Sequence, residues 1–351
     1  MKKRIIVIAT AARDGGAWRI VEMLAILASA DNSVDYTFIT LKPLVIANIQ
    51  NIIIKINTIF DRIKFELYGI RIIINNFETP PDIILSLNNL AVIGAPLIKQ
   101  YVYIHQAIPF YPEFKWGIRK NQIRLLFYQK FYGKLIWFSI RITDSKIIVQ
   151  TETMAQRIKA AWGLDSIRWF PLHPVSEVVK EGRRHGGGIT FLYPASASPH
   201  KNHKVLFEAL LVLRLHYPEI YQIINLVLPI EQHQCDYADD KVKFIGYCEH
   251  SEIELLYTNC NALLFPSVVE TVGLPLVEAS ALGLPILCSD TPFFREVLGG
   301  YSGVKFLPAL DPLAWALAIL QFVSSIHKQS TLLRFPQYIN KLRGTNLSDL
   351  R

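Results

Sequence analysis

Short apolar runs alternate with longer amphipathic segments along the first 170 residues. Continuous β-branched runs predict buried parallel strands, and apolar positions at helical spacing predict the helices between them. The predicted strands cover 3–9, 35–40, 82–87, 101–105 and 146–150, and the predicted helices cover 18–28 and 151–162. Strands that alternate with helices are typical of a doubly wound parallel α/β sheet.

The same pattern begins again after a polar, glycine-rich stretch at 181–188, which we interpret as a linker. It predicts strands over 189–193, 223–228, 242–244, 262–265 and 286–288, and helices over 204–216, 251–259, 276–282 and 311–323. The 351 residues are therefore expected to form two Rossmann-like domains, 1–175 and 186–324, and a tail, 325–351, that packs back toward the first domain. Ligands of such open sheets bind beyond the carboxyl ends of the strands.

Composition narrows the class of protein. With 51% hydrophobic and 19% charged residues, the chain is not a disordered one. Four cysteines without a Cys-x-x-Cys pair indicate neither a zinc site nor a disulfide framework, and they favour a reducing compartment. No apolar stretch is long enough to predict a membrane-spanning helix. The basic and apolar N-terminus is interpreted as a first strand rather than a signal peptide.

Charge is divided unevenly along the chain. Residues 1–172 hold 22 basic and 12 acidic side chains, a net +10, whereas residues 173–351 hold 15 and 17, a net −2. Residues 114–143 contain seven Lys or Arg, no acid and many aromatic residues. Three interpretations stay open: a solvated basic helix, a surface for anionic lipid headgroups, and, least favoured, a nucleic-acid site. Insertion into lipid requires rings such as Phe127 and Phe131 to face outward, while Leu125, Tyr128 and Tyr132 compete for the core-facing side.

The most informative segment is 265–279, Phe-Pro-Ser-Val-Val-Glu-Thr-Val-Gly-Leu-Pro-Leu-Val-Glu-Ala. A strand is predicted to end at Phe265 and a helix to begin near Pro275. Free backbone amides at 271–274 and the helix N-terminus suit a phosphate. The carboxylates of Glu270 and Glu278 can then accept hydrogen bonds from hydroxyls on either side of it, as in a sugar nucleotide. Taken alone, the two carboxylates favour a purely structural interpretation, in which Glu270 is a loop carboxylate and Glu278 an exposed helix residue.

The order of these residues resembles the signature of the retaining glycosyltransferases of family 4 (glycosyl transferases group 1), which have the GT-B fold. That signature places Glu-Ala after its first Glu with seven residues between the two Glu, as Glu278-Ala279 follows Glu270 here. Val272 stands where Phe is more usual. The resemblance continues through 242–247, 254–257 and 284–297, and is strong over about 189–320 but weak over 1–188.

The resemblance implies roles for residues of the second domain. Glu278 would bind the ribose of the donor nucleotide, Glu270 the donor sugar, and Lys201 the diphosphate, where a fixed cation offsets charge on the leaving group. The remaining donor-binding positions are Thr271, Val272, Gly273 and Leu274 beside the sugar and diphosphate, and Gly246 and Tyr247 in the base region.

In the first domain, the resemblance implies that Gly15 and Gly16 lie near the donor phosphates and acceptor, and that His105 approaches the transferred sugar. An ordinary turn and a structural histidine are the alternatives. One departure concerns Ala195 and Ser196, where the family usually has an Arg. With one cation fewer, either Lys204, His200 or Arg13 substitutes, or the loop amides and helix dipole carry more of the charge.

We therefore expect a retaining glycosyltransferase, a hexosyltransferase, that works without a cofactor or a metal ion. It would move sugar from a nucleoside-diphosphate sugar to a saccharide or polyisoprenyl-linked glycan, in bacterial surface-polysaccharide synthesis. The expected location is cytoplasmic, peripheral on an anionic membrane surface, and no nucleic acid is bound. The alternative is an epimerase-type or non-catalytic sugar-nucleotide-binding protein of the same fold. The donor base, sugar and acceptor are not specified by these residues.

Overall fold

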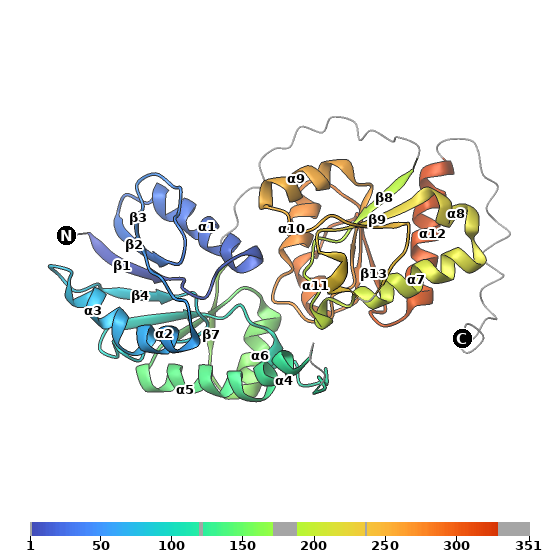
Figure 1. The fold of residues 1–351 in the computed structure, drawn as a ribbon. Helices are drawn as coiled ribbons and strands as arrows, with labels where there is room; N and C mark the ends of the chain where they lie inside the picture. The colour runs from blue at the N-terminus through green and yellow to red at the C-terminus, as the bar shows by residue number, and fades with distance from the viewer. Residues whose placement is uncertain (1, 119–121, 171–187, 236, 329–351) are drawn as a thin grey trace. The chain divides into compact units, whose positions relative to one another are not determined.

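A computed structural model describes residues 2–118, 122–170, 188–235 and 237–328. The chain divides into two compact units (Figure 1). Unit 1 comprises Met1–Val175, Val269–Leu274 and Arg295–Val297, and unit 2 comprises the remaining residues. Each unit is built around its own parallel sheet, as the sequence predicts.

Unit 1 contains a seven-stranded parallel sheet in the order β3-β2-β1-β4-β5-β6-β7. Its strands are β1 (Lys3–Ile8), β2 (Val34–Thr40), β3 (Gln50–Ile53), β4 (Ile83–Ser86), β5 (Lys99–Tyr103), β6 (Lys146–Val149) and β7 (Ser166–Arg168). The order reverses between β1 and β4, because β2 lies on one side of β1 and β4 on the other. The loops that follow β1 and β4 therefore meet at the switch point where open sheets bind ligands.

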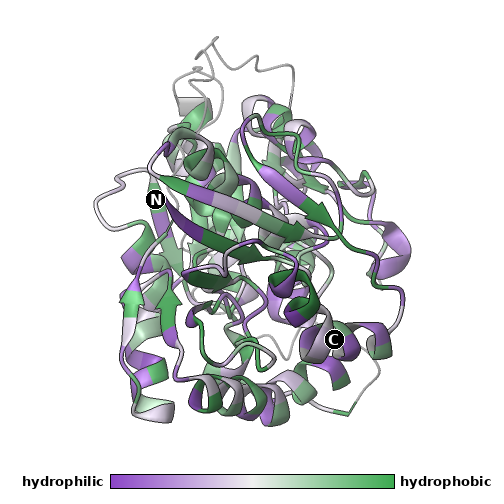
Figure 2. Cartoon of the chain, turned by 90° about the vertical axis from the view of Figure 1, so that its left-hand side faces the viewer, coloured by the Kyte–Doolittle hydropathy of each residue, from purple (hydrophilic) through white to green (hydrophobic). Residues whose placement is uncertain are grey.

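Helices cover both faces of this sheet. They are α1 (Gly15–Ala30), α2 (Ile59–Lys64), α3 (Ile70–Asn75), α4 (Ile123–Phe127), α5 (Gly133–Thr143) and α6 (Glu152–Trp162). Successive residues of β1 point to opposite faces. Val7 joins the core that contains Trp18 of α1, whereas Ile6 joins the core that contains Ile70 of α3. Figure 2 shows the hydrophobic residues along the inner strands.

Two π-helical turns interrupt the helices of unit 1. Phe65–Gly69 joins α2 to α3, and Tyr128–Tyr132 joins α4 to α5. Short turns of this kind are rare and occur often at functional sites.

Unit 2 contains a six-stranded parallel sheet in the order β10-β9-β8-β11-β12-β13. Its strands are β8 (Ile189–Leu192), β9 (Ile224–Leu228), β10 (Val242–Phe244), β11 (Ala262–Phe265), β12 (Ile286–Ser289) and β13 (Val304–Leu307). The helices of this half are α7 (His203–His216), α8 (Pro218–Ile223), α9 (His250–Asn259), α10 (Leu274–Ala281), α11 (Pro292–Val297) and α12 (Pro312–Lys328). The order reverses between β8 and β11, so the loops after these two strands are neighbours.

The predicted elements differ from the observed ones at their ends. The strand predicted over 101–105 is β5, which ends at Tyr103, so His105 lies in the following loop rather than at the strand end. The segments 181–187 and 329–351, predicted as linker and terminal tail, lie outside the described residues. Within the part of the chain that is described, none of the helices is both long and apolar enough to cross a membrane.

Candidate functional site

The loop that carries Lys201 lies beside the motif that follows β11. Lys201 ends a 3₁₀ turn, Pro199–Lys201, and its carbonyl accepts a hydrogen bond of 2.6 Å from the Tyr193 hydroxyl. The carbonyl of His200 accepts from the Val268 amide at 2.9 Å and the Ser267 hydroxyl at 3.2 Å. The structure therefore places the predicted phosphate lysine on a loop that is hydrogen-bonded to the Pro-Ser-Val part of the motif.

Asn202 holds this loop through its backbone conformation and two side-chain hydrogen bonds. Its backbone φ of 56° lies in the left-handed region, which asparagine tolerates better than most residues. Its side-chain Nδ2 donates to the Pro266 carbonyl at 3.1 Å and to the Ala309 carbonyl at 2.7 Å. One amide thus joins the loops that follow β8, β11 and β13 at the carboxyl edge of the sheet.

Glu278 is held by a buried tyrosine. It lies on α10 with a side chain 17% exposed, and its Oε2 accepts a hydrogen bond of 2.8 Å from the hydroxyl of Tyr257 on α9. Burial and the neighbouring Glu278 carboxylate raise the pKa of Tyr257 well above its ordinary value, so the phenol keeps its proton and acts as a donor. The other oxygen of Glu278, Oε1, lies 3.9 Å from Nδ1 of His250. The second ring nitrogen of His250, Nε2, lies 3.1 Å from Oε1 of Glu254. The sequence places Tyr257 near the base region but does not reveal its contact with Glu278.

The expected base region contains a position that requires glycine. Gly246 follows β10 with φ of 78°, and a Cβ atom there would lie 2.8 Å from Oε1 of Glu231. The positive φ therefore favours glycine here, and a larger residue would also have to displace the end of the Glu231 side chain. The next residue, Tyr247, has a side chain that is 61% exposed. Tyr247, predicted to lie in the base region, thus presents an exposed ring directly after a glycine of left-handed backbone conformation.

The loop between β11 and α10 contains Glu270 and the predicted anion-binding amides. Glu270 is half-buried, Val272 is buried, and Gly273 has φ of 74°. Helix α10 begins at Leu274, which is one residue before the predicted start. The four residues 271–274 thus lead directly into the helix N-terminus, as the sequence predicts. Val272, where Phe is more usual, is buried as an apolar side chain.

The cations proposed to replace the missing Arg differ in their surroundings. Lys204 lies on α7 with its side chain 83% exposed and pairs with Glu208 one turn later. Arg13 lies in unit 1, where it reaches the Ile56 carbonyl at 3.5 Å. The Nδ1 atom of His200 lies 2.9 Å from the Ser198 hydroxyl. Of these three, His200 alone belongs to the loop that carries Lys201.

In unit 1, Gly15 and Gly16 form the start of α1, directly after the β1 loop. Gly15 has φ of 62°, which glycine adopts without strain. Asp14 just before it pairs with Lys42 at 3.3 Å and gives no side-chain hydrogen bond to the helix amides. The two glycines thus lie at the carboxyl end of β1, at the switch point of the sheet.

His105 lies at the same edge of the sheet, in the loop after β5. Its backbone amide donates to Oδ1 of Asn89 at 2.7 Å, and its Nε2 lies 3.2 Å from Nδ2 of the same asparagine. Desolvation by burial lowers the pKa of His105 to about 4, so the ring is neutral near pH 7. Asn89 was not singled out from the sequence, although the pair Asn88-Asn89 after an apolar strand was a usable signal.

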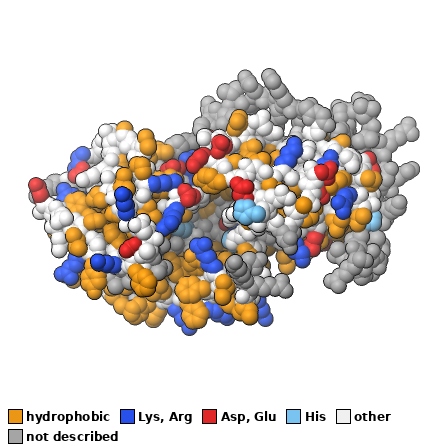
Figure 3. Space-filling view, viewed as in Figure 1, with side chains coloured by type: hydrophobic (Ala, Val, Ile, Leu, Met, Phe, Trp, Pro, Cys, Tyr) orange, Lys and Arg blue, Asp and Glu red, His pale blue; other side chains and the backbone are white. Residues whose placement is uncertain are grey.

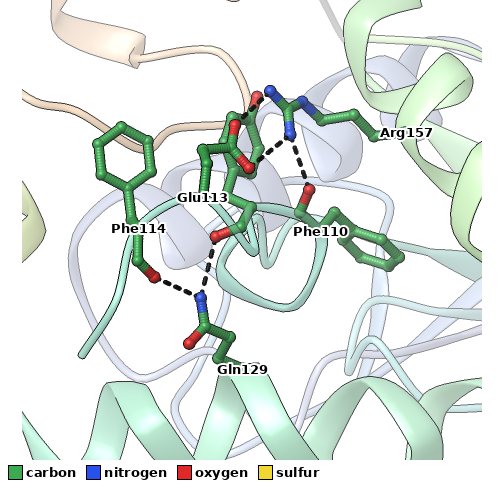
Figure 4. Close-up of polar contacts among 6 residues, drawn as sticks. Phe110, Glu113, Phe114, Gln129 and Arg157 are labelled. Atoms are coloured by element: carbon green, nitrogen blue, oxygen red, sulfur yellow. Dashed lines mark hydrogen bonds and ion pairs between the residues drawn. The ribbon is translucent and has the colours of Figure 1, made fainter. Parts of the chain in front are cut away.

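Arg157 and Gln129 hold the loop that continues from His105 (Figure 4). Arg157 of α6 pairs with Glu113 at 2.7 Å and donates to the Phe110 carbonyl at 2.9 Å. Its guanidinium stacks 3.7 Å from the centre of the Tyr111 ring. Gln129 donates through Nε2 to the carbonyls of Tyr111 and Phe114. The loop thus has fixed anchors on two helical segments.

The basic stretch leaves apolar side chains exposed on one surface of unit 1, which we term the 123–142 surface. Its exposed apolar members are Ile123, Phe127, Phe131, Leu135, Trp137, Phe138 and Ile142. The Phe127 and Phe131 rings stack at 5.8 Å and are 53% and 60% exposed, whereas Leu125 is buried. The exposed cations are Lys115, Arg124, Lys130, Lys134 and Arg141, while Arg119 and Lys120 lie outside the described residues. Figure 3 shows hydrophobic and basic side chains side by side along the lower edge of unit 1.

Several solved structures share the fold of this chain. WaaG, a glycosyltransferase involved in lipopolysaccharide biosynthesis, matches with a TM-score of 0.69 at 12% identity, over 96% of this chain and 98% of its own. Anabaena HepE in complex with UDP-glucose matches with a TM-score of 0.63 at 14% identity, over 93% and 92%. The chain has the GT-B fold of these glycosyltransferases, which confirms the predicted architecture.

The sequence of the second half is similar to a known family. Residues 176–332 match the model of the glycosyl transferases group 1. Over 268 residues it is 24% identical to the O-antigen chain mannosyltransferase RfbU of Salmonella typhimurium, covering 73% of this chain and 69% of that one. The predicted glycosyltransferase class is confirmed, whereas the retaining mechanism, the assignment to family 4 and the roles of individual residues stay predictions.

Proposed function

We propose that the chain transfers a sugar, with retention, from a nucleoside-diphosphate sugar to a saccharide or polyisoprenyl-linked acceptor during surface-polysaccharide synthesis. The observation that carries this proposal is the arrangement in unit 2. The Lys201 loop is hydrogen-bonded to residues 266–268. Glu278 lies on α10, the helix that follows the same motif, and accepts a hydrogen bond from Tyr257 of α9. A cation, free amides and an oriented carboxylate are the groups that a diphosphate and a ribose require. The similarity to an O-antigen mannosyltransferase supports a glycan acceptor.

Each residue has a distinct task in this proposal. Glu278 accepts hydrogen bonds from the ribose, and Lys201 stabilises negative charge that grows on the diphosphate as the glycosidic bond breaks. Glu270 and the amides of 271–274 bind the donor sugar and its phosphates. The departing phosphate oxygen takes the proton of the acceptor hydroxyl. His105 contacts the transferred sugar.

Two substitutions separate binding of the nucleotide from transfer of the sugar. Glu278→Ala should weaken binding of nucleoside diphosphate, because the ribose contact exists in the free nucleotide and in the donor. Glu270→Ala should leave diphosphate binding unchanged and lower the transfer rate, because it acts on the sugar. Each lost charged hydrogen bond corresponds to about 1.5–3 kcal/mol.

Calorimetric titration of UDP, GDP and ADP, followed by transfer assays with the matching sugar nucleotides, measures both effects. Glu219→Ala is a matched control, since this exposed carboxylate lies on α8 and has no part in the proposed site. Normal diphosphate affinity in Glu278→Ala together with parental transfer in Glu270→Ala contradicts the assignment. Release of a changed sugar nucleotide without an acceptor would indicate the epimerase alternative. Donor binding without transfer would indicate the non-catalytic alternative, which the absence of the usual Arg at 195–196 motivates.

The 123–142 surface supports a second part of the proposal, a peripheral position on the inner face of the cell membrane. Exposed rings beside cations suit the boundary between anionic headgroups and acyl chains. Each cation that reaches the surface contributes up to about 1 kcal/mol, and this attraction decreases with salt. The protein should therefore sediment with vesicles that contain phosphatidylglycerol and be released by high salt.

A quadruple variant should lose this vesicle binding and keep its nucleotide affinity. Its substitutions replace four cations of the surface by serine: Arg124, Lys130, Lys134 and Arg141. Serine at four other exposed lysines of unit 1, Lys3, Lys55, Lys64 and Lys99, is the matched control for net charge. If both quadruple variants lose vesicle binding to the same extent, the binding depends on the net charge of the protein and not on the 123–142 surface. Equal partitioning on neutral and anionic vesicles contradicts the proposed surface, and a salt-sensitive shift with oligonucleotides would favour nucleic acid instead.

A further inference from the structure

Asn89 is fixed in one orientation by two backbone donors. Its Oδ1 accepts hydrogen bonds from the amides of His105 at 2.7 Å and Gln106 at 3.0 Å. A reversed side-chain amide would place its own N–H groups against these two N–H donors. The oxygen therefore faces the backbone, and Nδ2 faces Nε2 of His105 at 3.2 Å.

This orientation determines which ring nitrogen of His105 carries the proton. Nδ2 of an asparagine only donates, so Nε2 must be the acceptor, and a neutral imidazole then has its proton on Nδ1. The ring is neutral near pH 7 because burial lowers the pKa of His105 to about 4. Nδ1 is buried and has no hydrogen-bond partner among the described residues. A buried donor without a partner is uncommon and indicates a ligand or water that it serves.

The turn that carries Asn89 is itself anchored from several elements. Asn89 has φ of 62°, and the preceding Asn88 accepts from the Ala11 amide at 2.8 Å. Nδ2 of Asn88 donates to the Thr10 hydroxyl and to Glu66, both at 2.8 Å. These contacts tie the turn to the loop after β1 and to the π-helical turn Phe65–Gly69. Asn89 is thus held in place independently of the histidine that it contacts.

The residues beside His105 on the neighbouring strands leave its Nδ1 unpaired. Gln150 follows β6, which pairs with β5, and its side chain interacts with the hydroxyl of Tyr103, the last residue of β5. The ring centre of Tyr103 lies 6.2 Å from that of His105. Since no described residue pairs with Nδ1, its proton remains for a ligand hydroxyl or a water molecule.

We propose that Asn89 is a positioning residue that holds His105 in the Nδ1–H tautomer, so that the histidine is a fixed hydrogen-bond donor to a hydroxyl of the sugar ligand. The inference rests on the proposed function for the identity of the ligand. It adds that Nδ1 already carries a proton and that Nε2 is occupied by Asn89. His105 therefore does not remove a proton from the acceptor.

The tautomer is measured directly by ¹⁵N NMR of the full-length labelled chain without ligand. The spectrum of His105→Gln identifies the signals of this ring among the nine histidines. We expect a protonated, pyrrole-type Nδ1 and an unprotonated, pyridine-type Nε2 at pH 7. The reverse assignment, or averaged signals from both tautomers, overturns the inference.

Two substitutions test the part played by Asn89. Asn89→Asp replaces the donor with a second acceptor, so the ring should change to the Nε2–H tautomer. Asn89→Gly keeps access to the left-handed backbone but removes the side chain, so the tautomers should average. Asn48→Asp is the matched control, because Asn48 is exposed and has a similar φ of 61°. If both Asn89 variants keep the Nδ1–H tautomer, other groups determine the tautomer of His105. That result overturns the positioning role of Asn89.

Transfer assays separate this inference from the proposed function. If His105 donates to the sugar, Asn89→Asp should lower kcat/KM for the sugar nucleotide at least tenfold while leaving the Kd for nucleoside diphosphate unchanged. Parental kcat/KM in a variant with the reversed tautomer overturns the donor role. Unaltered binding and transfer in Glu278→Ala and Lys201→Ala would instead contradict the proposed function, whatever tautomer the spectrum shows.

Discussion

Replacing Tyr257 by phenylalanine removes one oxygen from the buried contact that holds Glu278. The ring keeps its volume, so packing around α9 is preserved. The 2.8 Å hydrogen bond to Oε2 is lost, and a hydrogen bond to a charged group contributes about 1.5–3 kcal/mol. Because the Glu278 side chain is only 17% exposed, water replaces the phenol poorly. The free energy of unfolding should therefore fall by about 1.5–3 kcal/mol.

The same substitution should weaken nucleotide binding. Without the phenol, the carboxylate is free to turn toward His250, whose Nδ1 lies 3.9 Å from Oε1. The loss cannot exceed what the ribose contact supplies, and 1.4 kcal/mol corresponds to a tenfold change in Kd. We therefore expect Kd for nucleoside diphosphate to rise about three- to tenfold in Tyr257→Phe, which is less than in Glu278→Ala.

Urea unfolding and calorimetric titration measure the two effects. Tyr301→Phe is the control, because its hydroxyl donates to the neutral Leu284 carbonyl at 2.8 Å. It should lower stability by about 0.5–1.5 kcal/mol and leave the nucleotide Kd unchanged. If Glu278→Ala loses affinity and Tyr257→Phe does not, Tyr257 does not orient the carboxylate. A double variant whose Kd equals that of Glu278→Ala alone shows that the tyrosine acts through Glu278.

Three further predictions concern acid stability, the diphosphate and the base region. Burial, followed by the charge of Lys201, lowers the pKa of His203 to about 4, whereas the unfolded chain titrates near 6.5. The unfolded state therefore binds the proton more readily, so about 3 kcal/mol of stability present above pH 6.5 should be lost as the pH falls to 4. Urea unfolding across this range should show a shallower decline in His203→Gln, and equal declines refute the assignment. Lys201→Ala should lower kcat more than it raises KM, with partial rescue by Lys201→Arg, and an effect confined to KM contradicts a role in bond breaking. Gly246→Ala should cost more stability than Gly283→Ala by about 0.5–1.5 kcal/mol, because both have positive φ but only at Gly246 must the end of the Glu231 side chain move; equal unfolding free energies contradict the close contact.

The sequence predicts the inner strands well because burial on both faces leaves a continuous apolar run. β1 and β11 are of this kind. β3, β7 and β13 lie at sheet edges, are three or four residues long, and carry little apolar signal. The segment 59–75 is rich in isoleucine, and β-branched runs do not distinguish a buried helix from a strand.

The candidate site is predictable where spacing along the chain carries the information. Glu270, Glu278 and the glycine between them lie within one motif, so their grouping follows from order alone. The contacts of Asn89 with His105 and of Tyr257 with Glu278 join residues 16 and 21 positions apart. Both contacts depend on which strands and helices become neighbours. The order of strands in a sheet cannot be predicted from a local sequence pattern.

The two π-helical turns have a consequence for how the chain tolerates changes in length. Both reach the same asparagine, since Glu66 accepts from the Asn88 side chain and Tyr132 donates to its carbonyl. Each turn accommodates an extra residue relative to an α-helix. Deleting one residue within 128–132 would restore an α-helical turn, and Ile136 and Ile140 of α5 would keep their core-facing positions. A deletion at 137 or 138 meets no extra residue, so it would rotate the remainder of α5 by about 100° and carry Arg141 to the core position of Ile140. A single deletion should therefore be tolerated far better within 128–132 than within α5.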